Sequence, residues 1–276
     1  MKEYNSEEEF LKDYNSDEFE KLSMTADILV VSVSSEDTNN YRKTDKKMMS
    51  ILLAKRDDYP YKGKWCLPGG FLDPKTETLE DCARRVLKKE TNLSDIYLEQ
   101  LFTFDAIDRD PRMRIVSTAY VGLIDRNKIK SHIEHASWFD VISIEEKDNL
   151  VKMKLTNKEE ILELSIRKKL RKGSTDRYDF ISVDNKDIAF DHDKVILAGI
   201  ERIKNKVNYT DIVFNMMPEY FTLGELQQVY EVILNKKLLD PAFRRIIANK
   251  VEKTEKMKTG EGHRPSYLFR YKNENK

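Results

Sequence analysis

The chain has 276 residues, which exceeds the length of a typical single domain and favours two domains. Its 49 basic and 49 acidic residues cancel, so overall charge excludes no partner and only local asymmetry is informative. No apolar run approaches the ~18 residues of a membrane span, and the acidic N-terminus is unlike a signal peptide. With only Cys66 and Cys82, too few for a disulfide framework, we expect a soluble cytoplasmic protein that makes no membrane contact.

The first part of the chain is expected to begin a β-sheet. Residues 3–22 form a short amphipathic lead-in. Residues 25–34 (TADILVVSVS) are rich in aliphatic and β-branched side chains and predict a buried strand. A polar loop at 35–47 separates this strand from a second one at 48–56, and residues 64–67 lead into a glycine turn.

The glycine turn and the helix after it organise the rest of the chain. Gly69 and Gly70 allow the backbone to turn sharply and to approach a ligand closely. Either Thr76 or Thr78 can cap a helix that runs to Leu93. Four apolar residues at helical spacing give this helix a buried face: Leu79, Ala83, Val86 and Leu87.

This stretch, LPGGFLDPKTETLEDCARRVLKKETNL, resembles the Nudix box. The box has a Gly, five residues, a Glu, seven residues, and then Arg-Glu-aliphatic-x-Glu-Glu-x-Gly-aliphatic. Six residues, one more than in the box, separate Gly70 from Glu77, and seven residues separate Glu77 from Arg85. The order of strands, glycine turn and helix is also the order of a Nudix fold.

The departures from the box concern its metal site. In the family, the last three glutamates lie at i, i+3 and i+4 on one helical face, where they gather carboxylates around Mg²⁺ or Mn²⁺. Those positions here are Val86, Lys89 and Glu90. We therefore expect no catalytic residues. The residual box residues are Glu77, Arg85 and Glu90, and only Glu90 would ligate a metal.

A charged loop, residues 105–112, lies between predicted strands at 97–104 and 114–124. It is either a solvated loop or a phosphate-binding segment in which Arg109 and Arg112 offer planar guanidinium forks. The motif RDPR, with EQLFTF upstream, resembles the ADP-ribose-recognising branch of the Nudix family and its regulator offshoot. The resemblance favours a nucleotide site with these residues: Arg56, Trp65, Gly69, Gly70, Arg109, Asp110 and Arg112. For Arg56 and Trp65, a structural role is an equal alternative.

The middle of the chain gives weaker signals. We expect a short strand at 136–141 and further strands at 161–166 and 178–183. A basic turn at 167–173 would separate the last two, and we expect it to be solvated rather than to bind nucleic acid. A helix opening after Ile188 and ending at Val207 would connect to a second domain.

From Tyr209 the pattern is helix, turn, helix and hairpin. Thr222 and Glu225 give the capping-box signature of a first helix, which Asn235 ends. Asp240 and Pro241 suit the N-cap and first turn of a second helix. Its inward residues would be Phe243, Ile246 and Ile247. With a hairpin at 251–271 as a wing, this is a helix-turn-helix arrangement, whose second helix enters the major groove.

The C-terminal segment is basic. From Lys236 to Lys276 there are 12 Lys or Arg residues against 5 Asp or Glu residues. Such local asymmetry typifies a phosphate-binding face, although a basic surface on a small helical domain is the alternative. The expected DNA-binding residues are Thr222, Arg244, Arg245, Lys250, His263 and Arg264.

Together the two halves resemble the Nudix-related transcriptional regulators. The sequence pointers are the altered box, RDPR, AFDH at 189–192, FTLGELQQVYE at 221–231, FRR at 243–245 and HRPSYLFRY at 263–271. The resemblance implies an α+β protein, in which a Nudix-type α/β/α sandwich precedes a C-terminal winged helix-turn-helix domain. The expected domains are a Nudix-like effector-binding domain (1–190), a connector helix (191–207) and a DNA-binding domain (208–276).

The resemblance implies a DNA-binding repressor that senses ADP-ribose or a related nucleotide sugar. Its partners would be operator DNA, this effector and a second copy in a homodimer, and no cofactor would be required. The alternative is an active Nudix hydrolase whose basic domain only dimerises it. An unorthodox set of carboxylates would then hold Mg²⁺ or Mn²⁺: Glu77, Glu80, Asp81 and Glu90. Lys89 argues against this alternative.

Overall fold

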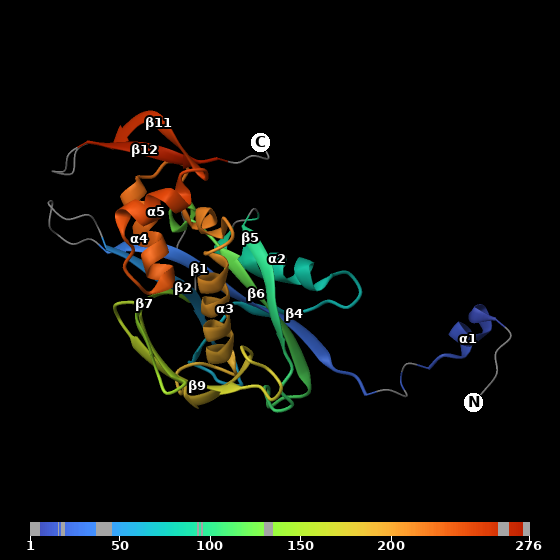
Figure 1. Cartoon of the computed structure of the whole chain (residues 1–276). Coiled ribbons are helices and arrows are strands. Elements are labelled where there is room, and N and C mark those ends of the chain that lie inside the picture. The colour runs from blue at the N-terminus through green and yellow to red at the C-terminus, as the bar shows by residue number, and fades with distance from the viewer. Residues whose placement is uncertain are drawn as a thin grey trace.

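The computed structural model describes residues 6–15, 17, 20–36, 46–92, 94, 96–129, 135–258 and 265–272. A mixed β-sheet with strand order β10-β9-β8-β7-β2-β1-β6-β5 forms its centre (Figure 1). The strands are β1 (Ser23–Glu36), β2 (Lys46–Lys55), β5 (Tyr97–Phe104), β6 (Ile115–Leu123), β7 (Ala136–Lys147), β8 (Leu150–Thr156), β9 (Ile161–Leu170) and β10 (Tyr178–Asp184). Two short strands lie off this path: β3 (Trp65–Cys66) pairs with β2, and β4 (Gly69–Phe71) pairs with β1.

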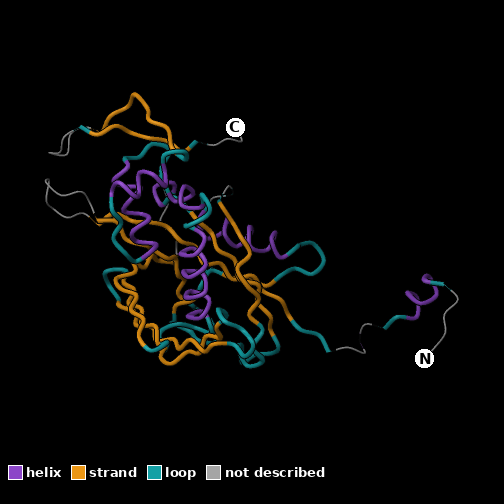
Figure 2. Tube along the Cα trace, viewed as in Figure 1, coloured by secondary structure: helices purple, strands orange, loops and turns teal. Residues whose placement is uncertain are grey.

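Helices cover both faces of the sheet because side chains alternate along its central strand. On β1, Ala26 and Ile28 pack with helix α2 (Leu79–Thr91) on one face. Leu29 and Val31 belong to the larger core on the other face, together with helix α3 (His192–Lys206). The predicted α/β/α sandwich is therefore confirmed, and Figure 2 shows its helices on either side of the strands.

The signal at the N-terminal end of α2 acts as predicted, whereas the helix ends two residues earlier than predicted. Of the two candidate caps, Thr78 is the N-cap, and it exchanges hydrogen bonds with Asp81 in a capping box. Thr76 instead donates to the carboxylate of Asp73. The helix ends at Thr91, and Asn92 adopts a left-handed conformation after it; the predicted last residue, Leu93, lies outside the described residues.

The middle of the chain contains more strand than predicted. Strand β7 continues to Lys147, and β8 is an additional strand. Strand β9 extends to Leu170, so the predicted basic turn at 167–173 is wrong over its first four residues. Its Lys168 is half-buried between Glu146 and Glu201, at 2.9 and 2.6 Å.

Helix α3, assigned above to a connector, covers the sheet as well as leading to the C-terminal domain. Gly199 lets it lie close to β1, because a Cβ atom there would come within 2.2 Å of Leu29 Cδ2. A 3₁₀ helix, η3 (Ile212–Met216), continues the same core towards the C-terminal domain. The domain boundaries themselves remain a prediction.

The C-terminal domain consists of α4 (Leu223–Leu234), α5 (Asp240–Ile247) and the hairpin of β11 (Val251–Lys258) and β12 (Ser266–Tyr271). Two details of the α5 prediction are wrong. Leu239, not Asp240, occupies the N-cap position, and Ile246 is 55% exposed while Phe243 and Ile247 are buried. The reason is that α5 packs only one face on α4, and Ile246 lies outside it.

Two further helical segments are short: α1 (Glu7–Asp13), which stands away from the sheet in Figure 1, and the 3₁₀ helix η2 (Arg126–Lys128). Over the residues that the structure describes, no helix has the length and apolar composition needed to cross a membrane.

Candidate nucleotide pocket and DNA-facing helix

A pocket of about 520 Å³ opens where β1 and β2 separate. The two strands pair from Val31 and Ile51 towards the hairpin end; before that point, β1 pairs with β4 and β2 with β3. The glycine turn between β3 and β4 therefore forms one wall. The other walls are the end of β2, the end of α2, the 109–112 loop and the start of α3. This volume is in the range of small-molecule sites, which is about 300–1,000 Å³.

Both glycines of the turn are sterically required. A Cβ on Gly69 would lie 2.2 Å from the Asp27 carboxylate, and one on Gly70 would lie 2.9 Å from Val86 Cγ2. Val86, at a family glutamate position, is thus buried beneath the turn. The local sequence has replaced a charged ligand of the box with apolar packing.

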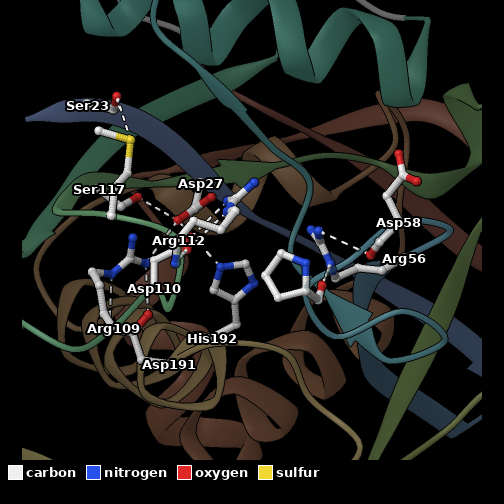
Figure 3. A network of polar contacts seen from close by, with 12 residues as sticks. Ser23, Asp27, Arg56, Asp58, Arg109, Asp110, Arg112, Ser117, Asp191 and His192 are labelled. Atoms are coloured by element: carbon white, nitrogen blue, oxygen red, sulfur yellow. Dashed lines mark hydrogen bonds and ion pairs between the residues drawn. The ribbon is translucent and has the colours of Figure 1, made fainter.

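A buried cluster of charges joins the pocket floor to the start of α3 (Figure 3). The guanidinium of Arg109 donates to both carboxylate oxygens of Asp191, at 2.8 and 3.3 Å, and lies 3.4 Å from Asp27. Burial alone would raise the pKa of Asp27, but His192, Arg109 and the Ser117 hydroxyl together lower it to about 2. The Asp27 carboxyl group is therefore held in its charged form although it is buried.

His192 ties this cluster to the glycine turn. Its Nδ1 accepts a hydrogen bond from the Leu67 backbone N–H at 2.9 Å, so that nitrogen carries no proton. Its Nε2 lies 3.5 Å from Asp27 Oδ2. The ring therefore fixes the backbone just before Gly69 relative to α3.

Two arginines of the pocket lie against one aromatic ring. The guanidinium carbons of Arg56 and Arg112 lie 4.9 and 5.8 Å from the centre of the Phe190 ring. Asp110 accepts two hydrogen bonds from the Arg112 guanidinium, at 3.0 and 2.8 Å, while the Arg112 side chain remains 41% exposed. This arrangement offers positive charge and a stacking surface to a ligand that carries phosphate and a planar base.

The structure brings most of the predicted ligand-binding residues together. Of the predicted residues, those that line the pocket are Arg56, Gly69, Gly70, Arg109, Asp110 and Arg112. Trp65 is not among them: it is buried, donates to Glu160 at 2.8 Å and packs edge-on against Phe139. Trp65 is thus placed in a structural role. The Arg109 fork is also occupied, because it is buried against Asp27 and Asp191.

Most of the carboxylates that the hydrolase alternative would need for a metal are engaged in other contacts. Glu77 accepts hydrogen bonds from Arg85 and Glu80 from Arg84, while Asp81 caps α2. Glu90 lines the pocket beside Lys89, and burial raises the pKa of its carboxyl group. No group of three or more His, Cys, Asp or Glu side chains is placed to hold a metal ion in the described ranges. The residues present do not fit the divalent-metal site of a Nudix hydrolase.

The predicted DNA-binding residues separate into three groups. Arg244 and Arg245 are exposed on α5. Thr222 and Lys250 are engaged, Thr222 in the capping box of α4 and Lys250 in an ion pair of 2.7 Å with Asp211. The predicted residues His263 and Arg264 lie outside the described residues.

Three pocket residues received no site role from the sequence: Asp27, Phe190 and His192. Phe190 and His192 fall in the AFDH pointer at 189–192, so a signal for them was present. Asp27 is the one charged residue of the apolar segment 25–34, and its partner Arg109 is 82 residues away.

Comparisons with known proteins identify both parts of the chain. Residues 40–160 match the NUDIX domain, and residues 213–271 match the NrtR DNA-binding winged helix domain. The chain is 31% identical over 271 residues to the ADPR responsive transcriptional repressor NtrR of Acinetobacter baylyi, covering 97% of this chain and 89% of that protein.

Two solved structures share this architecture. A MutT/nudix family protein of Enterococcus faecalis is 23% identical with a TM-score of 0.67, and the match covers 97% of this chain and 94% of that one. NrtR of Shewanella oneidensis in complex with a 27mer DNA is 25% identical with a TM-score of 0.62, over 90% of this chain and 93% of that one. With a Nudix domain and an NrtR-type winged helix in this order, and a full-length relative above 30% identity, the chain belongs to the NrtR family of transcriptional regulators.

Proposed function

We propose that this protein is a transcriptional repressor that binds operator DNA through its winged helix and an ADP-ribose-like nucleotide through its Nudix domain. The single observation that carries the proposal is that one chain contains both an arginine-flanked aromatic pocket and a winged helix with exposed arginines. The relative from A. baylyi is named as responsive to ADPR, and the relative from S. oneidensis was crystallised with DNA.

The pocket chemistry supports a nucleotide diphosphate as the effector. Arg112 and Arg56 supply positive charge near solvent, Phe190 supplies a flat apolar surface, and the glycine turn allows backbone approach. The exposed end of the Arg112 fork can hydrogen-bond phosphate oxygens. Binding requires no metal in this proposal, because the positive charge comes from arginine side chains.

The remaining parts of the proposal follow from the DNA-binding role. Winged helix regulators commonly read two half-sites with two-fold symmetry, so we expect a homodimer and a palindromic operator. The protein would act in the cytoplasm, where DNA and nucleotide are both available. No resident cofactor is needed for either binding event.

Hydrolysis of ADP-ribose should be negligible. The box retains Glu90, but Val86 is buried beneath Gly70 and Lys89 adds positive charge beside the pocket. The measurement is AMP release with Mg²⁺ and with Mn²⁺, for the wild type and for the double variant Val86→Glu, Lys89→Glu. Turnover near ~1 s⁻¹ that disappears in Glu90→Gln would establish the alternative, an active hydrolase.

Removing Arg112 should weaken nucleotide binding about 10- to 150-fold, because a charge-assisted hydrogen bond contributes about 1.5–3 kcal/mol. The measurement is calorimetric titration with ADP-ribose in the presence of a metal chelator, comparing the wild type with Arg112→Ala and Arg112→Lys. Arg112→Lys keeps the charge but loses the planar fork, and it should fall between the other two.

Arg114 provides a matched control, because it bonds the Asp105 carbonyl at 2.8 Å and is not among the residues that line the pocket. Arg114→Ala should bind like the wild type. Equal weakening by Arg112→Ala and Arg114→Ala would mean that the loop, rather than the fork, matters. Absence of any nucleotide binding at millimolar concentration would remove the sensor part of the proposal.

A further inference from the structure

A second groove of about 560 Å³ lies between the sheet and the winged helix domain. Lysines line it from both sides, Lys46 and Lys47 on β2 and Lys236 and Lys237 after α4. Apolar side chains of β2, β7 and α4 form much of its surface, and Ile142 among them is 51% exposed. The groove therefore combines an apolar floor with a basic rim.

The two sides of this groove are fixed to each other by hydrogen bonds. The backbone N–H of Lys47 donates to Gln228 of α4 at 3.2 Å, and the side chain of Asn235 donates to the Ile144 carbonyl at 3.1 Å. Lys237 is paired with Glu231 at 2.7 Å. Lys46 and Lys236 have no ion-pair partner within the part of the chain that the structure describes, so the rim keeps positive charge for an acidic occupant.

The N-terminal arm, residues 6–22, has the complementary chemistry. It contains seven acidic and two basic residues. Helix α1 within it has no buried residue, and three exposed apolar side chains lie on one of its faces: Phe10, Leu11 and Tyr14. An acidic helix with an apolar stripe matches an apolar groove with a lysine rim in both respects.

The arm leaves the sheet at the end of β1 that is far from the groove of its own chain. The arm joins β1 at Ser23, whereas Lys47 at the groove pairs with Ser35 at the other end of β1. Twelve residues of strand span about 40 Å, at ~3.3 Å per residue. The eight residues between Tyr14 and Ser23 span at most about 32 Å when fully extended, so a fully extended arm would place α1 only at the near end of this groove, where Met49 pairs with Val33. Figure 1 likewise shows α1 on the side of the molecule away from α4.

We propose that the N-terminal arm of one protomer docks its α1 face into the lysine-rimmed groove of a second copy. The apolar side chains Phe10, Leu11 and Tyr14 then cover the floor, while the acidic residues of the arm face the rim lysines. Each arm would bridge the Nudix and winged helix domains of its partner. The arm thereby becomes part of the dimer and touches the junction between the sensor and DNA-binding domains.

Trans cross-linking tests this placement directly. The two native cysteines are buried and form no disulfide, so a disulfide between engineered, exposed cysteines can be distinguished from them. Separately purified Leu11→Cys and Ile142→Cys proteins are mixed, allowed to exchange subunits and oxidised. A mixed disulfide between residues 11 and 142 is expected, identified by mass spectrometry of the linked peptides. The control partner is Ile161→Cys, which is 62% exposed on β9 and outside the groove.

Equal cross-linking of Leu11→Cys to both partners would overturn the proposal. So would a cross-link formed within single chains when both substitutions are present in one protein at high dilution. A wild type that sedimented as a monomer at every concentration would also overturn it, while leaving the DNA-binding proposal to its own test.

Charge reversal gives an independent readout of the same contact. Lys46→Glu with Lys236→Glu should raise the dimer dissociation constant about tenfold or more in sedimentation equilibrium, because like charges then face each other. Mixing this protein with Glu7→Lys, Glu8→Lys should restore association. The control reversal is Lys169→Glu with Lys172→Glu, two exposed residues outside the groove. Equal effects of the two reversals would contradict docking in the groove.

Discussion

Replacing Arg109 with methionine should lower the free energy of unfolding by about 3–5 kcal/mol, the cost of breaking a buried ion pair. The Arg109 side chain is 3% exposed, and its carboxylate partners Asp27 and Asp191 are nearly as buried. Removing the guanidinium would leave two buried carboxylates without the positive charge that offsets the cost of taking them out of water. The measurement is urea unfolding at pH 7, with Arg84→Met as the control.

The control is matched in chemistry but not in environment. Arg84 also pairs with a carboxylate, at 2.6 Å, but it lies one helical turn from Glu80 on the surface, with its side chain 45% exposed. Exposed pairs of this kind contribute about 0.3–0.5 kcal/mol. A loss of similar size in both variants would show that the buried cluster does not stabilise the fold in the way its geometry implies.

The pH dependence of the Arg109→Met variant provides a second check. In the wild type the folded-state pKa of Asp27 is lowered from 3.8 to about 2. The charged carboxylate therefore stabilises the folded state at pH values above 3.8, and this stabilisation is lost as the pH falls towards 2. Without Arg109, one of the interactions that lower the pKa of Asp27 is lost while His192 and Ser117 remain, so the pKa of Asp27 should rise above its wild-type value of about 2. The difference in the free energy of unfolding between wild type and variant should therefore narrow as the pH falls through this raised pKa towards 2.

The same cluster shows why the sheet, the pocket and α3 act as one unit. Asp27 belongs to β1, Arg109 to the loop before β6, and Asp191 and His192 to the start of α3. A ligand that contacts Phe190 therefore contacts the segment immediately before α3, and α3 leads through η3 to the winged helix. Coupling between nucleotide and DNA would be reciprocal, so ADP-ribose should change operator affinity by the same factor as DNA changes nucleotide affinity.

Local signals in the sequence predicted much of the fold. The strand at 25–34, the glycine turn, the threonine N-cap of α2 and the capping box of α4 depend on neighbouring residues, and each is present in the structure. Strand β8 was missed, although Val151, Met153 and Leu155 alternate with lysines in the period-2 pattern of a strand. The preceding segment, EEKDN, is charged throughout except for its last residue, so its pattern did not indicate that β7 and β8 are joined by a tight turn.

The site could be predicted only in part because its chemistry depends on distant residues. The RDPR motif lies in a loop that lines the pocket, but the motif alone does not show that Arg109 faces inward and Arg112 outward. Arg109 faces inward because it pairs with Asp27 on β1 and Asp191 at the start of α3. These two carboxylates are far from Arg109 in the sequence, so the motif alone does not reveal the pairing. Trp65 was a candidate for base contact, but the pairing of β3 with β2 turns its ring into the core.

Removing both Arg244 and Arg245 should abolish measurable operator binding at physiological salt. Both side chains are exposed on α5, beside the buried Phe243 and Ile247 that anchor the helix to the domain. An arginine that reads a base edge contributes about 1–3 kcal/mol, and its loss relaxes specificity at one position, whereas a phosphate contact weakens all sequences alike. The single variants should separate these two roles.

The measurement is fluorescence anisotropy with DNA selected from a random pool, at two salt concentrations. Binding should weaken steeply with salt, because phosphate contacts release counterions, and each lost phosphate contact should reduce the slope by about one. The selected DNA should be palindromic, with half-sites separated by about one helical turn, ~10 bp, or a multiple of it.

The control for this pair is a second pair of exposed basic residues on the Nudix domain, Arg167 and Lys169 of β9. Arg167→Ala with Lys169→Ala removes the same number of positive charges at a place remote from α5 in sequence. If α5 reads the operator, this control should retain specific binding with only a small change in salt dependence. Equal, weak affinity of the wild type and both double variants for every duplex would contradict the repressor proposal. The basic C-terminal domain would then be explained by dimerisation alone.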